Sequence, residues 1–523
     1  MTGPAKGAVA AGDRTTAAAA AEILQDGGNA FDAAVAAMFT ASVSEPVLCS
    51  LAAGGFLLAR PAAGTPVLYD FFGQTPRTPR PVDELDFLPV EADFGTVQQE
   101  FHIGLGSVAT PGLVAGAFAA HGDHGRLPMR RVIEPAVRAA RGGVAVAPLQ
   151  AQILDAVAPI FRWSEATRAL FDSRTRPGQT LQAGEILRMP GLALVLEALA
   201  AEGVDLFYRG DLADRMVALN IDGGGLLRHD DLAGYRVERR QPLERSFAGA
   251  TVFTNTAPSS GGPLIAFALE LVAAARAGRP SDDDEAARLA QLARIMAQSN
   301  QARRDAGLMD ECSDPVVARL LSAPFMADYL AAMTDRATKV GGTTHISVID
   351  ADGNAAALSV SNGEGCGHVL PGTDIMLNNM LGEEDTNPLG FFRWRPDSRV
   401  TSMMAPSIVE RGDGRLLALG SGGSNRIRSA ILQVLLHVLV HDRALSAAVQ
   451  APRIHFERGL LNIEHGFAAA TVDGLTAAFE RSEVWPDRNF FFGGVHAASH
   501  DPATAGFAAA GDPRRGGSAL IVA

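Results

Sequence analysis

The start of the chain, rich in alanine and glycine, has the apolar pattern of helices followed by strands. Thr15 or Thr16 can cap a helix that runs to about Asp26. Gly27-Gly28 then ends this helix, because glycine readily adopts the left-handed conformation that closes helices.

A second helix and a strand are predicted next. Asn29 can cap the helix, and Asp32 lies in its first turn, where a negative charge suits the helix dipole. The helix stops before Glu45-Pro46, because the residue before a proline disfavours helical geometry. The apolar run 54–59 is typical of a buried strand.

The middle of the chain is predicted to be mostly helical. Residues 129–241 have a helical pattern with breaks at Pro177-Gly178 and Gly223, and residues 284–333 are helical as well. The stretch 278–284 (GRPSDDD) between them is predicted to be a solvated loop, and its charge run is interpreted as surface rather than as a metal site.

The pattern changes to strands after Gly341-Gly342. Two hairpins are predicted, the first from 345–350 and 355–361 around Asp352-Gly353, the second from 407–410 and 416–419 around residues 412–414. A helix follows Gly422-Gly423-Ser424 and runs to about His441. The strands are apolar on both faces, so we expect stacked sheets between helical layers.

Length and charge limit the classes of protein. A chain of 523 residues is larger than one usual hydrophobic core, so we expect two domains or one large fold of two intertwined segments. A hydrophobic fraction of 47% fits a globular enzyme. The net charge of −13 argues against nucleic acid or an anionic membrane as the main partner.

Cysteines and apolar runs bear on compartment. Cys49, Cys312 and Cys366 are too few and too widely spaced for a disulfide framework or a metal cluster. The N-terminal residues lack a long apolar core bounded by a cleavage site, and no later apolar run has membrane-spanning length. From these features we expect a cytoplasmic enzyme.

A Gly-Gly-Thr-Thr sequence opens the first predicted hairpin. Two glycines give the backbone freedom for a strained turn, and Thr343 at that junction can attack the carbonyl that precedes it. Hydrolysis of the resulting ester leaves a free amine on Thr343, which can act as base toward its own hydroxyl. Taken alone, these residues are better explained by an ordinary strand start, since threonine favours strands.

Two more segments can carry chemistry. Residues 420–426 (GSGGSNR) lie between a strand and a helix, where backbone N–H groups can hold an anion such as a tetrahedral oxyanion. Without a Gly-Lys-Ser/Thr ending, a nucleotide loop is disfavoured, although a plain tight turn stays open. Thr401 and Ser402 can bind the polar end of a substrate or satisfy local backbone groups.

Taken together, the ordered motifs resemble those of the gamma-glutamyltranspeptidase family along most of the chain. They include the following stretches: 27–36, 45–46, 54–56, 108–112 (VATPG), 258–262 (PSSGG), 343–345, 352–354, 377–379, 401–403, the Gly422-Gly423 loop and 451–453 (APR). The resemblance implies a four-layer αββα sandwich of the N-terminal-nucleophile hydrolase type.

The same resemblance implies self-cleavage before Thr343 into segments 1–342 and 343–523, which stay together without a covalent link as one intertwined fold. It assigns roles to matching residues: Thr343 as nucleophile, Ser361 as a hydroxyl partner of the nucleophile, Thr401 and Ser402 as substrate contacts, and Gly422 and Gly423 as the oxyanion loop. The loop aligns ambiguously by one residue, so Ser424 is an alternative donor.

Departures from the family concern the γ-glutamyl pocket. Phe72 stands where an arginine usually clamps the substrate α-carboxylate, and Gly363 and Met380 replace polar residues. Glu383 keeps a carboxylate that can bind an ammonium group. A replacement clamp could come from Arg393, Arg395 and Arg399, two of which we interpret as ordinary surface arginines.

The histidines give little further evidence of a catalytic or metal-binding role. His345 shares a strand face with Thr343, and a packing role for it is at least as well founded as a catalytic one. His102 and His368 have no metal-ligand spacing, and we expect neither metal nor cofactor.

The function predicted from sequence is therefore an amidohydrolase or acyltransferase that forms an acyl-ester on Thr343, most similar to glutathione hydrolase. The altered pocket favours, as an alternative, hydrolysis of another small amide, as in oxamate amidohydrolases. A processed but inactive scaffold is the third hypothesis. The expected partners are a small amide substrate and the two segments of the precursor, and a homo-oligomer of the processed pair stays open.

Overall fold

Two β-sheets lie face to face in the middle of the molecule, and helices cover their outer faces. The computed structural model describes residues 4–93, 98–277, 284–331 and 342–523. Strands β11 (Thr344–Asp350) and β12 (Ala355–Ser361) of one sheet contact β16 (Leu416–Gly422) of the other, and β1 (Gly7–Ala11) contacts β20 (Gly494–Asp501). This arrangement is the αββα sandwich that the family resemblance implied, and that prediction is confirmed.

The first sheet has seven antiparallel strands. In spatial order they are β22 (Ser518–Val522), β1 (Gly7–Ala11), β11 (Thr344–Asp350), β12 (Ala355–Ser361), β2 (Gly54–Arg60), β3 (Val67–Phe71) and β8 (Glu238–Arg240). The predicted hairpin β11–β12 is confirmed, with Thr344 opposite Val360. Strands from both sides of Gly342 are interleaved in this sheet, because β1 lies between β22 and β11 and β2 pairs with β12.

The second sheet has six antiparallel strands. Their order is β21 (Gly506–Ala510), β20 (Gly494–Asp501), β16 (Leu416–Gly422), β15 (Ser407–Arg411), β10 (Ala250–Thr254) and β9 (Leu243–Phe247). The second predicted hairpin is confirmed as β15–β16, but β16 continues to Gly422, three residues past the predicted end. Pairing of Gly422 with Gly494 in β20 accounts for the extension.

Helices from the first half of the chain cover the seven-stranded sheet. They are α1 (Arg14–Gln25), α2 (Ala30–Ser44), α3 (Leu113–His124), α4 (Met129–Gly142), α5 (Pro148–Ala156), α6 (Ala158–Phe161), α7 (Glu165–Phe171), α8 (Pro190–Glu202), α9 (Asp205–Tyr208), α10 (Asp211–Asp222) and α11 (His229–Gly234). Helices α1, α2 and α3 contact the sheet directly, α4 packs on α2, and α8 packs on α4. Every residue of α2 is buried, so this helix is the centre of its layer.

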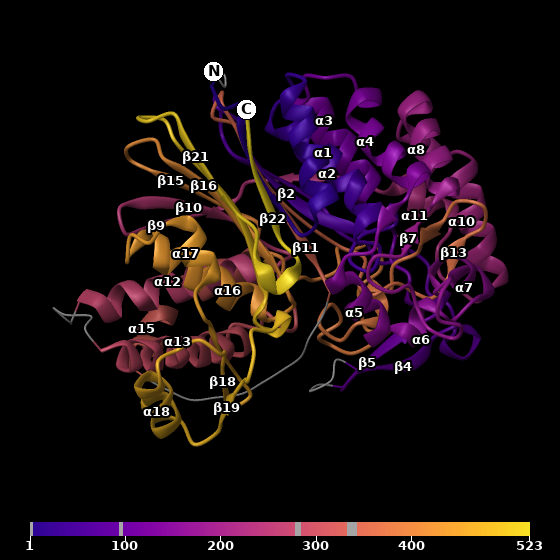
Figure 1. Ribbon diagram of the computed structural model, residues 1–523. Helices are drawn as coiled ribbons and strands as arrows, with labels where there is room; N and C mark the ends of the chain where they lie inside the picture. The colour runs from indigo at the N-terminus through magenta and orange to yellow at the C-terminus, as the bar shows by residue number, and fades with distance from the viewer. Residues whose placement is uncertain (1–3, 94–97, 278–283, 332–341) are drawn as a thin grey trace.

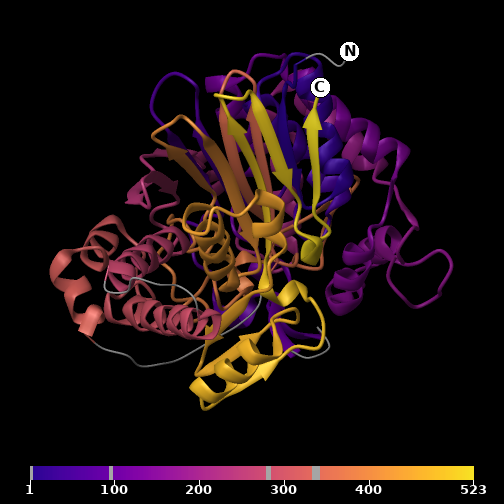
Figure 2. The same cartoon turned by 60° about the vertical axis from the view of Figure 1, so that its left-hand side comes forward.

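A second group of helices covers the six-stranded sheet. It consists of α12 (Gly261–Ala277), α13 (Glu285–Asp305), α14 (Asp314–Leu320), α15 (Ala323–Ala331), α16 (Arg426–Leu439), α17 (Leu445–Gln450) and α18 (Ala469–Ala478). Helix α16 packs on β16, α17 on β20 and α12 on β9. Both views show these helices on the opposite side of the sheets from α1–α4 (Figures 1 and 2).

The remaining strands form small sheets outside the sandwich. They are the pairs β4 (Leu88–Asp93) and β5 (Gln98–Ile103), β6 (Val144–Ala145) and β7 (Ile186–Leu187), β13 (Val369–Leu370) and β14 (Ile375–Met376), and the trio β17 (Ile454–Glu457), β18 (Leu460–Ile463) and β19 (Ser482–Val484). Among the described residues, no helix is both long and apolar enough to cross a bilayer.

Local signals explain most helix ends. Asn29 caps α2 and Asp32 lies in its first turn, as predicted. The Asp32 carboxylate also accepts from the Asn29 N–H, which completes a capping box. The cap of α1 was predicted wrongly: Asp13, not Thr15 or Thr16, accepts from the Thr15 N–H at 2.6 Å. The Thr16 hydroxyl is used elsewhere, because it donates to buried Glu45.

Three other predictions need comment. Residues 238–240, assigned to a helical region, form the edge strand β8, because Asp70 and its neighbours in β3 offer free pairing groups. The solvated-loop prediction for 278–284 lies almost entirely outside the described residues, as does Gly341. The helical prediction for 284–333 is confirmed as α13, α14 and α15 as far as residue 331.

Candidate active site

Thr343 lies immediately before strand β11 and lines a cavity formed mostly by loops and strand ends. The contacts below are those of the chain with Gly342 and Thr343 joined. Alternate β11 residues face opposite ways: Ile346 and Val348 pack toward α2, and Ile349 packs toward the other sheet. By this alternation Thr343 faces the second sheet.

The residue after Thr343 is held firmly from the helical side. Thr344 Oγ1 donates to Glu45 Oε2 at 2.6 Å, and Thr16 Oγ1 donates to Glu45 Oε1 at 2.8 Å. Burial, with the charge of Asp13, raises the pKa of Glu45 to about 7. The start of β11 is thereby tied to residues of α1 and to the chain just after α2.

Gly342, on the other side of Thr343, is held by two side chains. Ser361 at the end of β12 donates its hydroxyl to the Gly342 carbonyl at 2.6 Å. Glu364 Oε1 accepts from the Gly342 N–H at 2.8 Å. Ser361, predicted from family spacing, therefore lies against the peptide bond that joins Gly342 to Thr343.

The glycine-rich loop approaches Thr343 from the second sheet. A Cβ placed on Gly422 would lie 1.9 Å from the Thr343 carbonyl oxygen, so only glycine fits there. Gly423 and Ser424 have positive φ angles of 120° and 50°, and helix α16 starts at Arg426. The structure thus brings Gly422 and the helix N-terminus to the nucleophile candidate, while the Ser424 hydroxyl donates to Asp385.

The side chains of Thr401 and Ser402 line two different spaces. Ser402 lines the cavity of Thr343, and its Oγ accepts from the Met404 N–H at 3.0 Å. Thr401 instead donates to the Pro258 carbonyl at 3.2 Å and lines a neighbouring groove. Of the two predicted substrate contacts, only Ser402 reaches the cavity.

The cavity has an acidic wall. It encloses about 420 Å³, counting the space open to solvent at its mouth, and Glu383 and Asp385 line it. Burial raises the pKa of Asp385 to about 6 and, with the charge of Asp385, that of Glu364 to about 8. Burial and repulsion by both neighbours raise the pKa of Glu383 well above its usual range. Glu364 and Asp385 were not identified from the sequence.

The opposite wall is apolar. Phe72, Met380, Met403, Met404 and Ile427 line it, and no arginine or lysine of the described residues does. Phe72 is 2% exposed and stacks on Phe56 with ring centroids 5.5 Å apart. The departures found in the sequence therefore lie in the cavity itself.

Gly363, another departure, is explained by its neighbours. Its φ angle is 63°, and an added Cβ would lie 2.0 Å from Asn379 Oδ1 and 2.3 Å from Glu383 Oε1. A side chain here would displace Glu383, so the glycine makes room for the carboxylate.

The three arginines of residues 393–399 have different surroundings. Arg399 pairs with buried Asp70 at 3.1 Å, and Arg395 pairs with Glu311 at 3.2 Å. Arg393 lines the groove next to the cavity. None of the three lines the cavity of Thr343, so they do not replace a clamp there.

The histidines pack rather than line the cavity. His345 lies between the sheets, with Nδ1 2.8 Å from Ser359 Oγ and Nε2 3.0 Å from Ser347 Oγ, and burial lowers its pKa well below the usual range. His102 stacks on Phe87, and His368 lies 3.3 Å from Asp86. Within the described ranges, no group of three His, Cys, Asp or Glu side chains could hold a metal ion.

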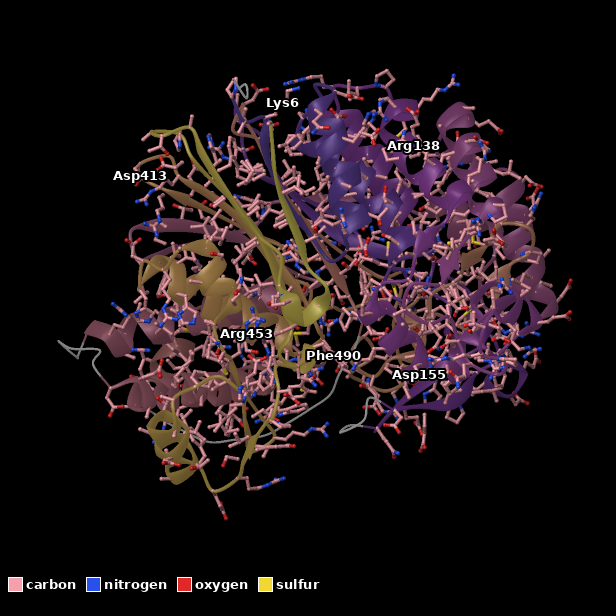
Figure 3. All side chains as sticks on the ribbon, in the orientation of Figure 1. Lys6, Arg138, Asp155, Asp413, Arg453 and Phe490 are labelled. Carbon is pink, nitrogen blue, oxygen red and sulfur yellow. The ribbon has the colours of Figure 1, made fainter. Side chains whose placement is uncertain are left out.

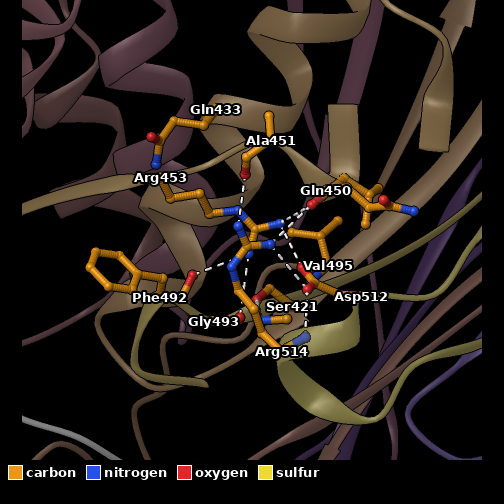
Figure 4. Close-up of polar contacts among 12 residues, drawn as sticks. Ser421, Gln433, Gln450, Ala451, Arg453, Phe492, Gly493, Val495, Asp512 and Arg514 are labelled. Carbon is orange, nitrogen blue, oxygen red and sulfur yellow. Dashed lines mark hydrogen bonds and ion pairs between the residues drawn. The ribbon is translucent and has the colours of Figure 1, made fainter. Parts of the chain in front are cut away.

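A buried ionic network lies next to the glycine-rich loop, around the residue labelled Arg453 in Figure 3. Arg453 donates to Asp512 at 2.6 Å and to the carbonyls of Phe492 and Gly493 at 3.2 and 3.3 Å (Figure 4). Gly493 packs against Ser421 and Gly422. The network therefore shapes the strand ends that carry the loop.

Comparison with known proteins agrees with this architecture. The family model for gamma-glutamyltranspeptidase matches residues 16–522. The chain is 31% identical to the glutathione hydrolase proenzyme of Pseudomonas aeruginosa, over 99% of this chain and 94% of that protein. It is also 31% identical to the acylase ACY 1 proenzyme of Pseudomonas sp. (strain V22), over 90% of this chain and 86% of that protein.

A solved structure shows the same fold. The cephalosporin acylase from Bacillus halodurans superimposes with a TM-score of 0.83 at 23% identity, covering 99% of this chain and 96% of that one. The resemblance expected from the sequence is confirmed. The chain is an enzyme that belongs to the gamma-glutamyltranspeptidase family.

Proposed function

We propose that the chain cuts itself between Gly342 and Thr343 and then hydrolyses or transfers small amides through an acyl-ester on Thr343. The observation that carries this proposal is the surroundings of the uncut peptide. Its carbonyl accepts from Ser361 at 2.6 Å, and Thr343 lies in a cavity against Gly422.

Self-cleavage in this proposal starts from the Thr343 hydroxyl. Its oxygen attacks the Gly342 carbonyl carbon, the C–N bond breaks, and the hydroxyl proton passes to the nitrogen. Water then hydrolyses the ester, leaving a carboxylate on Gly342 and an amine on Thr343. The Ser361 hydroxyl is placed to stabilise the charge that develops on the carbonyl oxygen.

Turnover uses the amine that cleavage exposes. The amine takes the proton of its own hydroxyl, and the oxygen attacks the substrate amide. N–H groups of residues 422–424, at the start of α16, are the proposed donors to the oxyanion. The acyl-ester is then resolved by water or by an amine.

For the acyl group we propose γ-glutamyl or a close relative. Two features support it: the glutathione hydrolase relatives and the carboxylate of Glu383 in the cavity, which can bind an ammonium group. Phe72 favours a second candidate, an amide of another small acid, because a phenyl ring cannot pair with the α-carboxylate of a glutamyl group. The family also includes acylases, such as the ACY 1 proenzyme.

Substitution at Thr343 tests the proposal. Thr343→Ala is expected to give one uncut, folded and inactive chain, and Thr343→Ser to cut and turn over more slowly. Wild-type pieces scaled from 54.6 kDa have masses of roughly 36 and 19 kDa, if mass per residue is even along the chain. Intact mass, N-terminal sequencing and turnover of γ-glutamyl and other short acyl amides are the measurements. Full activity of an uncut chain, or a new N-terminus at another residue, would refute the mechanism.

A further inference from the structure

Glu364 contacts the residue on the acyl side of the proposed cut, yet no step described so far uses it. It lies three residues beyond Ser361 and is 2% exposed. Its Oε1 accepts from the Gly342 N–H at 2.8 Å, and its backbone N–H donates to Asn379 Oδ1 at 2.9 Å. Asn379 also abuts Gly363, so the backbone that carries Glu364 is held in place.

The two hydrogen bonds to Gly342 act on different peptide planes. The Gly342 N–H and the Gly342 carbonyl lie on either side of its α-carbon, and the carbonyl belongs to the peptide that is to be cut. Glu364 accepts from the first and Ser361 donates to the second. Together they restrain the backbone of a residue that, as glycine, has the most freedom to lose.

The close packing around Gly342 also restrains its backbone. A Cβ on Gly342 would lie 3.1 Å from Glu364 Oε1 and 3.2 Å from the Gly363 carbonyl oxygen. The glycine is therefore closely surrounded on the side of Glu364. Such a fit favours one orientation of the carbonyl relative to Thr343, and attack by a hydroxyl depends strongly on that orientation.

We propose that Glu364 is a positioning residue for self-cleavage, acting through its hydrogen bond to the Gly342 N–H. It does not touch the reacting atoms. It holds the nitrogen of Gly342 in place so that the carbonyl held by Ser361 keeps one orientation relative to the Thr343 hydroxyl. This inference rests on the proposed cleavage at Thr343 and names a further residue on which the cleavage rate depends.

Removal and conservative replacement of the carboxyl separate positioning from simple packing. Glu364→Ala loses the acceptor and is expected to slow self-cleavage about 10- to 100-fold, the cost of leaving the Gly342 N–H without a partner. Glu364→Gln keeps an acceptor oxygen at the same reach and is expected to stay within about threefold of wild type at neutral pH. Glu197→Gln, which alters an exposed carboxyl of α8 that pairs with Arg141, serves as the control for loss of a carboxyl and should not slow cleavage.

The pH profile gives a readout that packing alone would not move. Because the pKa of Glu364 is raised to about 8, its carboxyl ionises above neutral pH and becomes a stronger acceptor. Asp385 and Glu383 disfavour that ionisation, and Arg515 favours it. The wild-type rate should therefore contain a rise near pH 8 that the Gln variant lacks.

The assay follows precursor made by cell-free synthesis and sampled over time by gel and intact mass. Thermal unfolding of each variant in a Thr343→Ala background checks that the uncut chain folds. If Glu364→Ala folds and cuts at the wild-type rate, or if the Gln variant is as slow as the Ala variant and keeps the wild-type pH profile, the inference is wrong. If the wild-type chain is never cut before Thr343, the proposed function itself fails.

Discussion

A methyl group on Gly422 tests whether the closeness of the glycine-rich loop to Thr343 sets the geometry of the site. In Gly422→Ala the new Cβ would start 1.9 Å from the Thr343 carbonyl oxygen, whereas real Cβ contacts are essentially never under 3.0 Å. The strand end or Thr343 must therefore move by about 1 Å, and a displacement of that size typically costs about 100-fold in rate. Loss of an aligned oxyanion donor costs a further amount of similar size.

Both self-cleavage and turnover should fall in Gly422→Ala by at least about 100-fold, because the same loop serves both reactions in the proposed mechanism. Overpacking should also lower the free energy of unfolding by about 1–3 kcal/mol. Intact mass over time measures the cleavage, and denaturation in a Thr343→Ala background measures the stability. Gly412→Ala in the β15–β16 turn is the control, since a Cβ there meets nothing within 4 Å. Wild-type cleavage by a folded Gly422→Ala chain would refute the reasoning.

Two further predictions concern buried charges. Arg453→Met leaves Asp512 without its 2.6 Å partner and should lower the free energy of unfolding by about 3–5 kcal/mol in chemical denaturation, whereas Arg415→Met on the surface should change it little. A loss for Arg453→Met no larger than the surface control would contradict this. Asp385, whose pKa is raised from 3.8 to about 6, is protonated in the folded chain where it ionises in the unfolded one, so stability should fall by about 3 kcal/mol between pH 4 and pH 6. Asp385→Asn in the Thr343→Ala background should flatten that part of the profile, and an unchanged slope would show that Asp385 is not its source.

Elements with strong local signals could be predicted from the sequence. The β11–β12 hairpin has apolar strands around Asp352-Gly353, and α2 has Asn29 and Asp32 at its start, so local chemistry suffices for both. Strand β8 could not be predicted in this way. Its residues, Glu238–Arg240, are charged, and they form a strand because β3 offers an unpaired edge.

The residues of the candidate site also divide into those that sequence motifs predict and those that only the fold reveals. Thr343, Ser361 and the glycine-rich loop follow from motifs, and the fold brings them together. Thr401 and Ser402 are neighbours in an irregular stretch, and their side chains reach different spaces, which the sequence pair does not reveal. Glu364 carries no motif signal, because its contact with Gly342 depends on a turn that brings together residues 22 positions apart.

The position of Thr343 also bears on what holds the proposed pieces together. Strands from before and after the proposed cut pair with each other in both sheets. In the first, β11 lies between β1 and β12, and β12 pairs with β2. In the second sheet, β10 pairs with β15 across the same boundary. Backbone hydrogen bonds and two buried cores would therefore keep the pieces joined after one peptide bond is broken.

The same interleaving places the new chain end. Thr344 is bonded to Glu45, and Thr16 to the other oxygen of that carboxyl, so residues of the first piece hold the strand that begins with the nucleophile. An amine released at Thr343 would be next to a strand that cannot swing away, because its side chains are buried on both faces. Cleavage would therefore convert the Thr343 nitrogen from an amide to an amine while the surrounding fold stays in place. A nucleophile that serves as its own base requires both.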